Sequence, residues 1–248
     1  MALYRQEDIP GFGKIRQVGL GDLKGRKGVY RYEQREAASG FIEVQEQAQV
    51  AGLDDVLMRK LEKMGVSKSS HLNKADVRIN DVLASVKMGR VGKSSLINHQ
   101  ARSGFISIFG VNSDAFRLLD AEVLRYIDLR RGALITEDVG WDRRKEMNLF
   151  MNDSFKDAFR LIFNYFVFDG TVGFGPSSFP AQSVISVEDA FDPRTWTSFS
   201  RADFFDYCWK KLVFSLRRHA KANFTSEDEP WFLLTDDGNP KAQLSLRI

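Results

Sequence analysis

The chain has 248 residues, of which 43% are hydrophobic and 28% are charged, and this composition is typical of a folded globular protein. The length suits one domain with a sizeable core, and 20 phenylalanines favour a compact structure over a disordered one. A formal net charge of +3 permits a polyanionic partner without requiring one, and the single cysteine, Cys208, excludes an internal disulfide.

The sequence shows neither a signal peptide nor a membrane-spanning segment. Residues 1–13 include acidic side chains and lack the apolar centre of a signal peptide. The longest apolar stretch, residues 161–168, is much too short to cross a bilayer. We therefore expect a soluble, cytoplasmic protein with no membrane partner.

The first part of the chain predicts one helix and one hairpin. Residues 1–30 are rich in Gly, Lys and Arg and indicate an irregular polar lead-in. Apolar residues recur at helical spacing over 39–65, which predicts a helix. Over 75–87, apolar and polar residues alternate on one side of Asn80-Asp81, and an apolar run begins on the other. This pattern predicts a β-hairpin.

The rest of the chain predicts three helices, a loop rich in Gly, Pro and Ser, and a final hairpin. An apolar stripe preceded by a cap at Ser113 or Asp114 marks the first of these helices. Helices and hairpins in this order favour an α/β fold with a mixed central β-sheet flanked by helices. The expected segments are helices at 114–131, 142–166 and 200–221, a loop at 170–185 and a hairpin at 231–248.

The hairpin at 75–87 carries an acid and an amine that are expected to meet. Asp76 is expected near the open end of one strand, and Lys87 near the open end of its neighbour. A carboxylate there can hold a divalent cation, and an amine can orient a water against a phosphate ester. Asp76 would then be the anionic metal ligand, and Lys87 would place or activate the attacking water.

This arrangement resembles the D…(D/E)XK active site of the PD-(D/E)XK nucleases. The family has Glu or Asp two residues before the lysine, whereas this chain has Ser85, which removes one negative charge from the metal site. The resemblance implies that the backbone carbonyl of Val86 is a metal ligand and that a helix before the hairpin supplies the missing carboxylate. Glu43 and Glu46 are both candidates for that carboxylate.

A polar segment follows Lys87 directly, as it does in small type II restriction endonucleases. Such side chains hydrogen-bond phosphates and base edges. The final hairpin is also similar, with a turn that contains Gly and Asn before its closing strand. The residues assigned to DNA binding are Arg90, Lys93, Ser94, Ser95, Asn98, His99, Gln100, Arg102, Asn239, Lys241 and Gln243.

The resemblance covers residues 43–105 and 225–248. It implies a Mg²⁺-dependent, sequence-specific type II restriction endonuclease that hydrolyses phosphodiester bonds of double-stranded DNA. Residues 1–248 would form a single nuclease domain with the PD-(D/E)XK fold, either as a monomer or as a homodimer. We expect its catalytic core at about 39–110 and its C-terminal DNA-recognition elements at about 200–248.

Further basic residues fall on the expected helix at 200–221. Lys210, Arg217 and Lys221 would share one face of that helix. A row of cations of this kind is compatible with contacts to DNA phosphates.

Two other functions stay open. Gly-Lys-Ser-Ser at 92–95 resembles a GTPase phosphate loop, and Asn-Lys-Ala-Asp at 73–76 matches the guanine-reading motif of circularly permuted GTPases. A phosphate loop needs a first glycine five residues before Gly92, however, and Lys87 stands there. Ser85 suggests the other alternative, a non-catalytic DNA-binding protein on a decayed nuclease fold.

Overall fold

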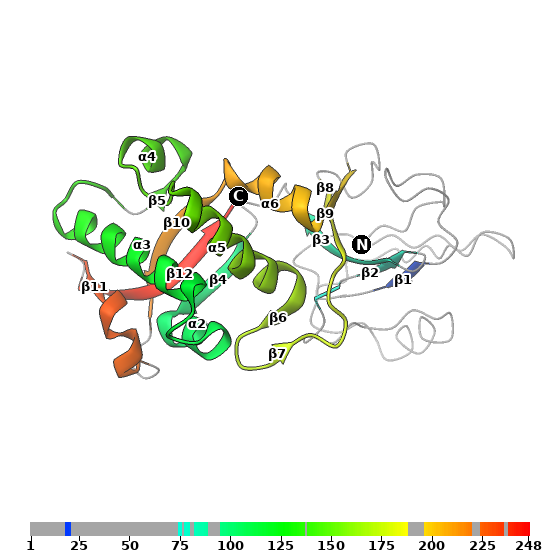
Figure 1. Ribbon diagram of the computed structural model, residues 1–248, viewed down its shortest axis with the longest axis horizontal. Coiled ribbons are helices and arrows are strands. Elements are labelled where there is room, and N and C mark those ends of the chain that lie inside the picture. The colour runs from blue at the N-terminus through cyan, green and yellow to red at the C-terminus, as the bar shows by residue number, and fades with distance from the viewer. Residues whose placement is uncertain are drawn as a thin grey trace, which may run out of the picture. The chain divides into compact units, whose positions relative to one another are not determined.

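The computed structural model describes residues 18–20, 74–75, 77–79, 82–88, 95–136, 138–187, 196–219, 224–235 and 238–248. The protein is mixed α/β and divides into two compact units (Figure 1). Unit 1 comprises residues 1–92 and 177–202, and unit 2 comprises residues 93–176 and 203–248. The stretch expected to form the catalytic core, about 39–110, is therefore shared between the two units.

Unit 1 contains a mixed five-stranded sheet with the strand order β1-β2-β3-β8-β9. β1, β2 and β3 pair antiparallel in succession, β3 pairs parallel with β8, and β8 pairs antiparallel with β9. The predicted hairpin is confirmed by the β2–β3 pair. The strands are β1 Val18–Leu20, β2 Val77–Ile79, β3 Val82–Met88, β8 Ser183–Val187 and β9 Trp196–Ser200.

The buried residues of β3 and two hydrogen bonds near its first residue fix its central position in the sheet. Ala84 on β3 and Val184 on β8 are completely buried, as expected of neighbouring strands in the middle of a sheet. The side-chain Oε1 of Gln182 accepts a hydrogen bond from the N–H of Leu83 at 2.9 Å, and the N–H of Gln182 donates to the Leu83 carbonyl at 2.7 Å. These two bonds fix where β8 begins to run alongside β3.

Unit 2 contains an antiparallel sheet with the order β11-β12-β10-β5, and β4 also pairs with β12. β12 is the longest strand among the described residues, and β4, β10 and β11 all pair with it. Its antiparallel pairing with β11 confirms the predicted final hairpin. The strands are β4 Ser95–Ala101, β5 Asp138–Val139, β10 Val213–Arg218, β11 Leu233–Leu234 and β12 Pro240–Arg247.

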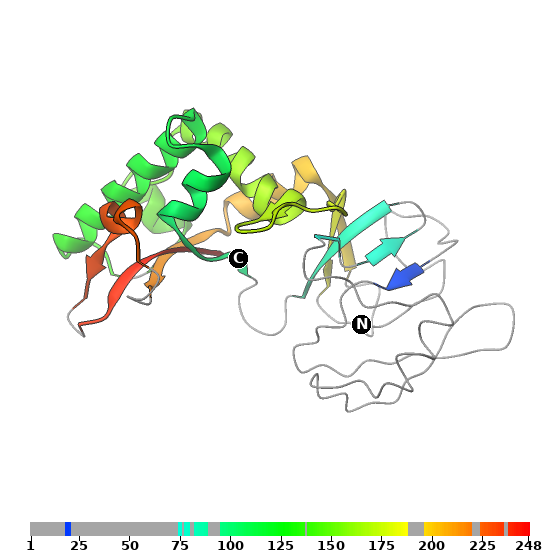
Figure 2. The same ribbon diagram turned by 90° about the horizontal axis from the view of Figure 1, so that it is seen from below.

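Helices α2, α3 and α5, drawn in green, lie on one face of the sheet of unit 2 (Figure 2). α3 spans Asp114–Arg131, as predicted, and the Ser113 side chain caps it by accepting from the Phe116 N–H at 3.2 Å. Phe214 and Leu216 of β10 and Leu244 and Leu246 of β12, two residues apart on each strand, are buried toward these helices. The other helices and short strands are α2 Arg102–Phe109, α4 Trp141–Glu146, α5 Asp153–Asn164, a π-helical segment Tyr165–Asp169, β6 Gly170–Thr171, β7 Gly175–Pro176, α6 Arg201–Trp209 and a 3₁₀ helix Ser226–Trp231.

The single helix predicted at 142–166 is wrong, because the chain breaks between α4 and α5. Asn148 and Phe150 have positive φ angles of 49° and 55°, which a helix does not allow. Asn152 then begins a new helix, since its side chain accepts from the N–H of Ser154 at 2.8 Å. The break lets Phe150 stack on Phe214 of the sheet, with ring centroids 4.1 Å apart.

The helix predicted at 200–221 is also wrong, because it ends at Trp209 and is followed by β10. The carbonyl of Cys208 accepts from the N–H groups of Lys211 and Leu212 and closes the helix. Over residues 214–217, apolar and polar side chains alternate with the period of a strand. Lys210 and Arg217 therefore do not share a helix face, and Lys221 lies outside the described residues.

Two segments expected to be irregular contain strands. Val18–Leu20, in the predicted lead-in, pairs with β2, and the predicted loop at 170–185 contains β6, β7 and the beginning of β8. The helix predicted at 39–65 lies outside the described residues.

Candidate functional site

The β2–β3 hairpin of unit 1 carries part of the predicted catalytic site. Val77 pairs with Ala84 and Ile79 with Val82, and Asp76 immediately precedes β2 in the sequence. Asp76 itself, like Glu43 and Glu46, lies outside the described residues. The structure therefore shows the strand of Ser85, Val86 and Lys87, and it leaves the positions of the three carboxylates as predictions.

Ser85 and Lys87 lie on the same face of β3, because alternate residues of a strand point the same way. Ser85 is 2% exposed, whereas Lys87, nearer the end of the strand, is half-buried. On the neighbouring parallel strand, Val184 pairs with Ser85 and Ser186 pairs with Lys87. An amine thus stands at the outer end of a buried strand, where it can reach solvent or a ligand while its backbone stays fixed.

The two predicted DNA-recognition segments come together in unit 2. β4 carries Ser95 to Gln100, β12 carries Lys241 and Gln243, and the two strands pair antiparallel although more than 130 residues separate them in sequence. Arg90, Lys93 and Ser94 lie outside the described residues.

A β-bulge in β4 turns two of the predicted recognition residues outward. Between the pairs Gln100–Leu244 and Ile97–Leu246, β12 has one residue and β4 has two, Asn98 and His99. His99 has a φ of 51°, and both side chains are exposed. Bulges of this kind redirect side chains and are frequent beside functional sites.

The strand assignment of residues 95–101 counts against the GTPase alternative. A phosphate loop of the Gly-Lys-Ser type leads directly into a helix, whose N–H groups bind the phosphate. Here Ser95 begins a strand, and its hydroxyl donates to the Ile97 carbonyl at 3.3 Å.

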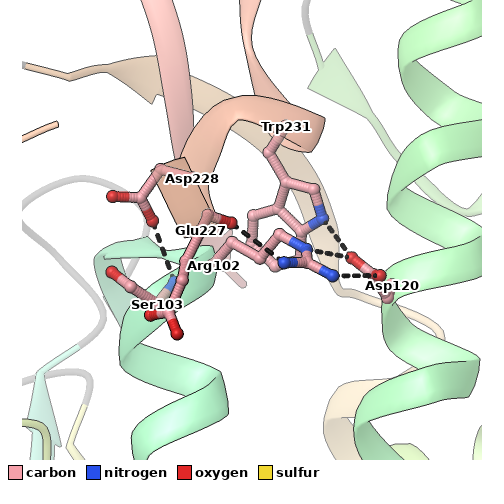
Figure 3. A network of polar contacts seen from close by, with 6 residues as sticks. All are labelled: Arg102, Ser103, Asp120, Glu227, Asp228 and Trp231. Carbon is pink, nitrogen blue, oxygen red and sulfur yellow. Dashed lines mark hydrogen bonds and ion pairs between the residues drawn. The ribbon is translucent and has the colours of Figure 1, made fainter. Parts of the chain in front are cut away.

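Arg102 has a full set of contacts within the protein. Its Nε and Nη2 donate to the two carboxylate oxygens of Asp120 at 2.7 and 2.8 Å, and its Nη1 donates to the Glu227 carbonyl at 2.9 Å (Figure 3). The guanidinium also lies 5.1 Å from the ring centre of Phe116. The hydrogen bond to Asp120 raises the pKa of Arg102. These contacts favour a structural role for Arg102, which joins α2, α3 and the 3₁₀ helix.

A second carboxylate completes this network. Asp228, completely buried, accepts from the Ser103 N–H at 2.8 Å (Figure 3). It also accepts from the Thr225 hydroxyl at 2.9 Å, and its Oδ2 lies 3.6 Å from Nε2 of His219. Burial opposes the charge of Asp228, but the hydrogen bonds from Ser103 and Thr225 outweigh it and lower its pKa. Asp228 thus caps α2 and the 3₁₀ helix together.

The face of the unit 2 sheet opposite the helices carries cations that the sequence analysis did not bring together. Gln243 and Arg247 lie on this face of β12, and Arg217 of β10 pairs with Gln243. A β-bulge next to Gln243 turns Lys241 to the other face, where it pairs with Arg218 and with the buried Leu233. Burial, and then the nearby charge of Arg130, lowers the pKa of Lys241. Asn239, the last of the residues expected to bind DNA, accepts a hydrogen bond at its backbone carbonyl from the Thr235 hydroxyl, at 3.0 Å. We call the residues Arg217, Gln243 and Arg247, with Asp138 of β5, the basic sheet face.

Sequence reasoning missed Asp138 and Arg247 and placed Arg217 on a helix. The alternation Val-Phe-Ser-Leu-Arg at 213–217 was a signal for a strand, and Leu-Ser-Leu-Arg at 244–247 repeats it. No local signal links Asp138 to either arginine, since only the pairing of β5 with β10 brings them together.

No protein-family model, curated protein or solved structure matches this chain. Among the described residues, no helix combines the length and the apolar character that crossing a membrane requires.

Proposed function

We propose that the chain is a Mg²⁺-dependent, sequence-specific endonuclease of the PD-(D/E)XK type that cleaves double-stranded DNA. The observation that carries the proposal is the arrangement of β3. Ser85 and Lys87 lie on one face of a strand in the middle of a mixed sheet, and the antiparallel neighbour of that strand begins directly after Asp76. The pairing of β4 with β12 supports it further, because residues expected to contact DNA converge in one sheet.

The oxygen donors on β3 fit a hard cation. Ser85 has a hydroxyl and Val86 a backbone carbonyl, and Mg²⁺ prefers oxygen ligands. Asp76, with Glu43 or Glu46, would contribute the negative charge that the ion needs. The bound ion would supply Lewis-acid stabilisation of the charge that develops on the phosphate.

The chain's own residues then have separate tasks. The Lys87 ammonium donates hydrogen bonds that orient the attacking water and offset charge on the phosphate oxygens. Ser85 fills the place of the family's second acid without adding charge, so the site depends more strongly on Asp76 and on a helix glutamate. The fixed backbone of β3 holds Lys87 in place relative to the water.

Plasmid cleavage tests the proposal. Wild-type protein is incubated with supercoiled plasmid and Mg²⁺, and Asp76→Ala and Lys87→Ala are compared with Lys145→Ala, a control at an exposed lysine of α4. We expect discrete fragments from the wild type and the control, and none from the two site variants at unchanged thermal midpoint. Undiminished cutting by Lys87→Ala would refute the assignment.

The decayed-nuclease alternative is favoured by one observation, the neutral and buried Ser85. It predicts a mobility shift of duplex DNA with no cleavage by the wild type. The Ser85→Glu variant restores the family's second acid. Cleavage by this variant would show that the site lacks only that charge, and no cleavage would show that it has lost further groups.

A further inference from the structure

Two arginines of the basic sheet face share one carboxylate. Nη2 of Arg217 lies 3.4 Å from Oδ1 of Asp138, and Nη2 of Arg247 lies 2.5 Å from its Oδ2. The three side chains are 28%, 24% and 39% exposed, in the order Arg217, Arg247 and Asp138. The carboxylate therefore uses one oxygen for each guanidinium and stays within reach of solvent.

The ion pair between Arg247 and Asp138 has to cross a strand. β10 lies between β12, which carries Arg247, and β5, which carries Asp138, and Ser215 is the residue of β10 that pairs with Asp138. Ser215 and its partner Ser245 on β12 are small and are 1% and 2% exposed. Small side chains at these two positions leave room for the guanidinium to extend over the sheet.

The group has more donors than acceptors. The Ser215 hydroxyl and Nε of Arg247 are buried without a hydrogen-bond partner within the described residues. An unpaired buried donor costs about 1–3 kcal/mol, so such groups call for an explanation. One additional anion with several oxygens would balance the charge of the second arginine, since the two arginines share one carboxylate.

The charge on this face is unbalanced in the same direction. Arg217 and Arg247 carry two positive charges, against one negative charge on Asp138. Gln243, between Lys241 and Arg247 on β12, adds an amide that can donate or accept. A polar and cationic surface of this composition is complementary to a polyanion.

We propose that the basic sheet face binds the phosphate backbone of double-stranded DNA, and that Asp138 occupies in the free protein the place that a phosphate takes in the complex. The choice of duplex DNA rests on the function proposed above. Carboxylate and phosphate both accept paired hydrogen bonds from guanidinium groups, so one can replace the other between Arg217 and Arg247. Asp138 then lowers the affinity for every duplex equally, because it competes with phosphate and reads no base.

Fluorescence anisotropy of a labelled duplex tests this in full-length protein, with Ca²⁺ in place of Mg²⁺ and a series of salt concentrations. We expect Arg217→Gln and Arg247→Gln each to weaken binding and to reduce the slope of log K against log salt by about 1. Asp138→Asn is expected to tighten binding by roughly 3–10-fold, because the competing charge is gone. The control Arg117→Gln removes an exposed cation of α3, in the helical layer, and should leave the slope unchanged.

Several outcomes would overturn the inference. They are unchanged salt slopes for both arginine variants, weaker binding by an Asp138→Asn variant of wild-type thermal midpoint, or tighter binding of duplex RNA or poly-aspartate than of duplex DNA. Plasmid cleavage measured separately distinguishes the two proposals. If the variants change DNA binding as described but the wild type never cleaves DNA, the DNA-binding proposal stands and the nuclease proposal fails. If all three variants bind and cleave like the wild type, the nuclease proposal stands and the DNA-binding proposal fails.

Discussion

Arg102 and Asp120 are joined by two parallel hydrogen bonds of 2.7 and 2.8 Å, and Trp231 donates a third, also of 2.7 Å, to the same carboxylate. Their side chains are only 13% and 16% exposed, so solvent screens the pair weakly. The pair links the beginning of α2 to α3 and to the 3₁₀ helix. Arg102, which the sequence analysis assigned to DNA binding, is therefore a fixed part of the core of unit 2.

Asp120→Ala should therefore destabilise the protein strongly. The change leaves the Arg102 guanidinium without its counter-ion and the Trp231 indole N–H without its acceptor. We expect a loss of about 3–5 kcal/mol in the free energy of unfolding, measured by urea denaturation. Glu146→Ala, which breaks the exposed pair with Arg143 on α4, is the control and should change stability by less than about 1 kcal/mol.

An Arg102→Ala variant of unchanged stability with reduced DNA affinity would contradict this structural role. It would return Arg102 to the set of DNA-binding residues.

Asp228 should make the stability of the protein depend on pH at the acid end. Its pKa in the folded protein is lowered by hydrogen bonds from Ser103 and Thr225, against the effect of burial. The folded state therefore favours the carboxylate, and this contribution is fully present above the unfolded value of about 3.9. It is lost as the pH falls through the lower folded pKa.

The measurement is urea denaturation of wild type and Asp228→Asn at pH 7, 5 and 3. We expect the variant to be less stable by about 1–3 kcal/mol at pH 7 and the difference to shrink at pH 3. Asp157→Asn, at an exposed position of α5, should follow the wild type at every pH. A difference that grows on acidification would show that the carboxylate of Asp228 is not the favoured form.

The contrast between α3 and β10 shows which parts of this fold can be predicted from sequence. α3 is encoded locally, by an apolar stripe over five turns and by the cap at Ser113, and its predicted bounds are confirmed. β10 is a strand because it pairs with β12, which lies about 30 residues further along the chain. Its short alternating pattern fits the predicted helix as well as a strand, because six residues contain too few periods to decide.

The same distinction applies to the candidate site. The β2–β3 hairpin is a local structure, and the sequence was sufficient to predict it. The parallel strand β8 is not local, because a connection of more than 90 residues separates it from β3, and no pattern near Ser183 identifies its partner. Asp138, Arg217 and Arg247 likewise meet only after the sheet of unit 2 has formed.

Arg144 should be replaceable by an apolar residue of similar length. Its side chain is completely buried between Trp141, Trp209 and Phe214, with the guanidinium 5.0–5.2 Å from each ring centre. Its Nη2 donates to the Trp209 carbonyl, but Nε and Nη1 have no hydrogen-bond partner within the described residues. Burial lowers the pKa of Arg144 to about 10, because the apolar surroundings stabilise the charge less than water does.

Arg144→Met keeps most of the volume and removes the charge, so we expect stability between unchanged and about 2 kcal/mol higher. Arg144→Ala leaves a cavity among the three rings and should cost about 2–4 kcal/mol. Urea denaturation of the two variants measures both effects. A Met variant as unstable as the Ala variant would show that the guanidinium itself stabilises this cluster.

A side chain at Gly170 should destabilise the protein, although the backbone conformation there is open to any residue. It follows the π-helical segment and has φ −166° and ψ −173°, which is ordinary extended backbone. A Cβ built there would lie 2.6 Å from the carbonyl oxygen of Gly175 and 2.6 Å from the Tyr165 hydroxyl. Because the first of these atoms is backbone in the β6–β7 pair, the chain itself would have to move.

We therefore expect Gly170→Ala to destabilise the protein by about 1–3 kcal/mol. Gly140→Ala is the matched control, since Gly140 also has an extended conformation, with φ −82° and ψ −176°, and a Cβ there meets nothing within 4 Å. The control should differ from wild type by no more than about 1 kcal/mol. Both substitutions remove the same backbone flexibility of a glycine, so a lower thermal midpoint for Gly170→Ala alone would locate the cost in the contact between β6 and β7. Equal thermal midpoints for the two variants would contradict that close approach.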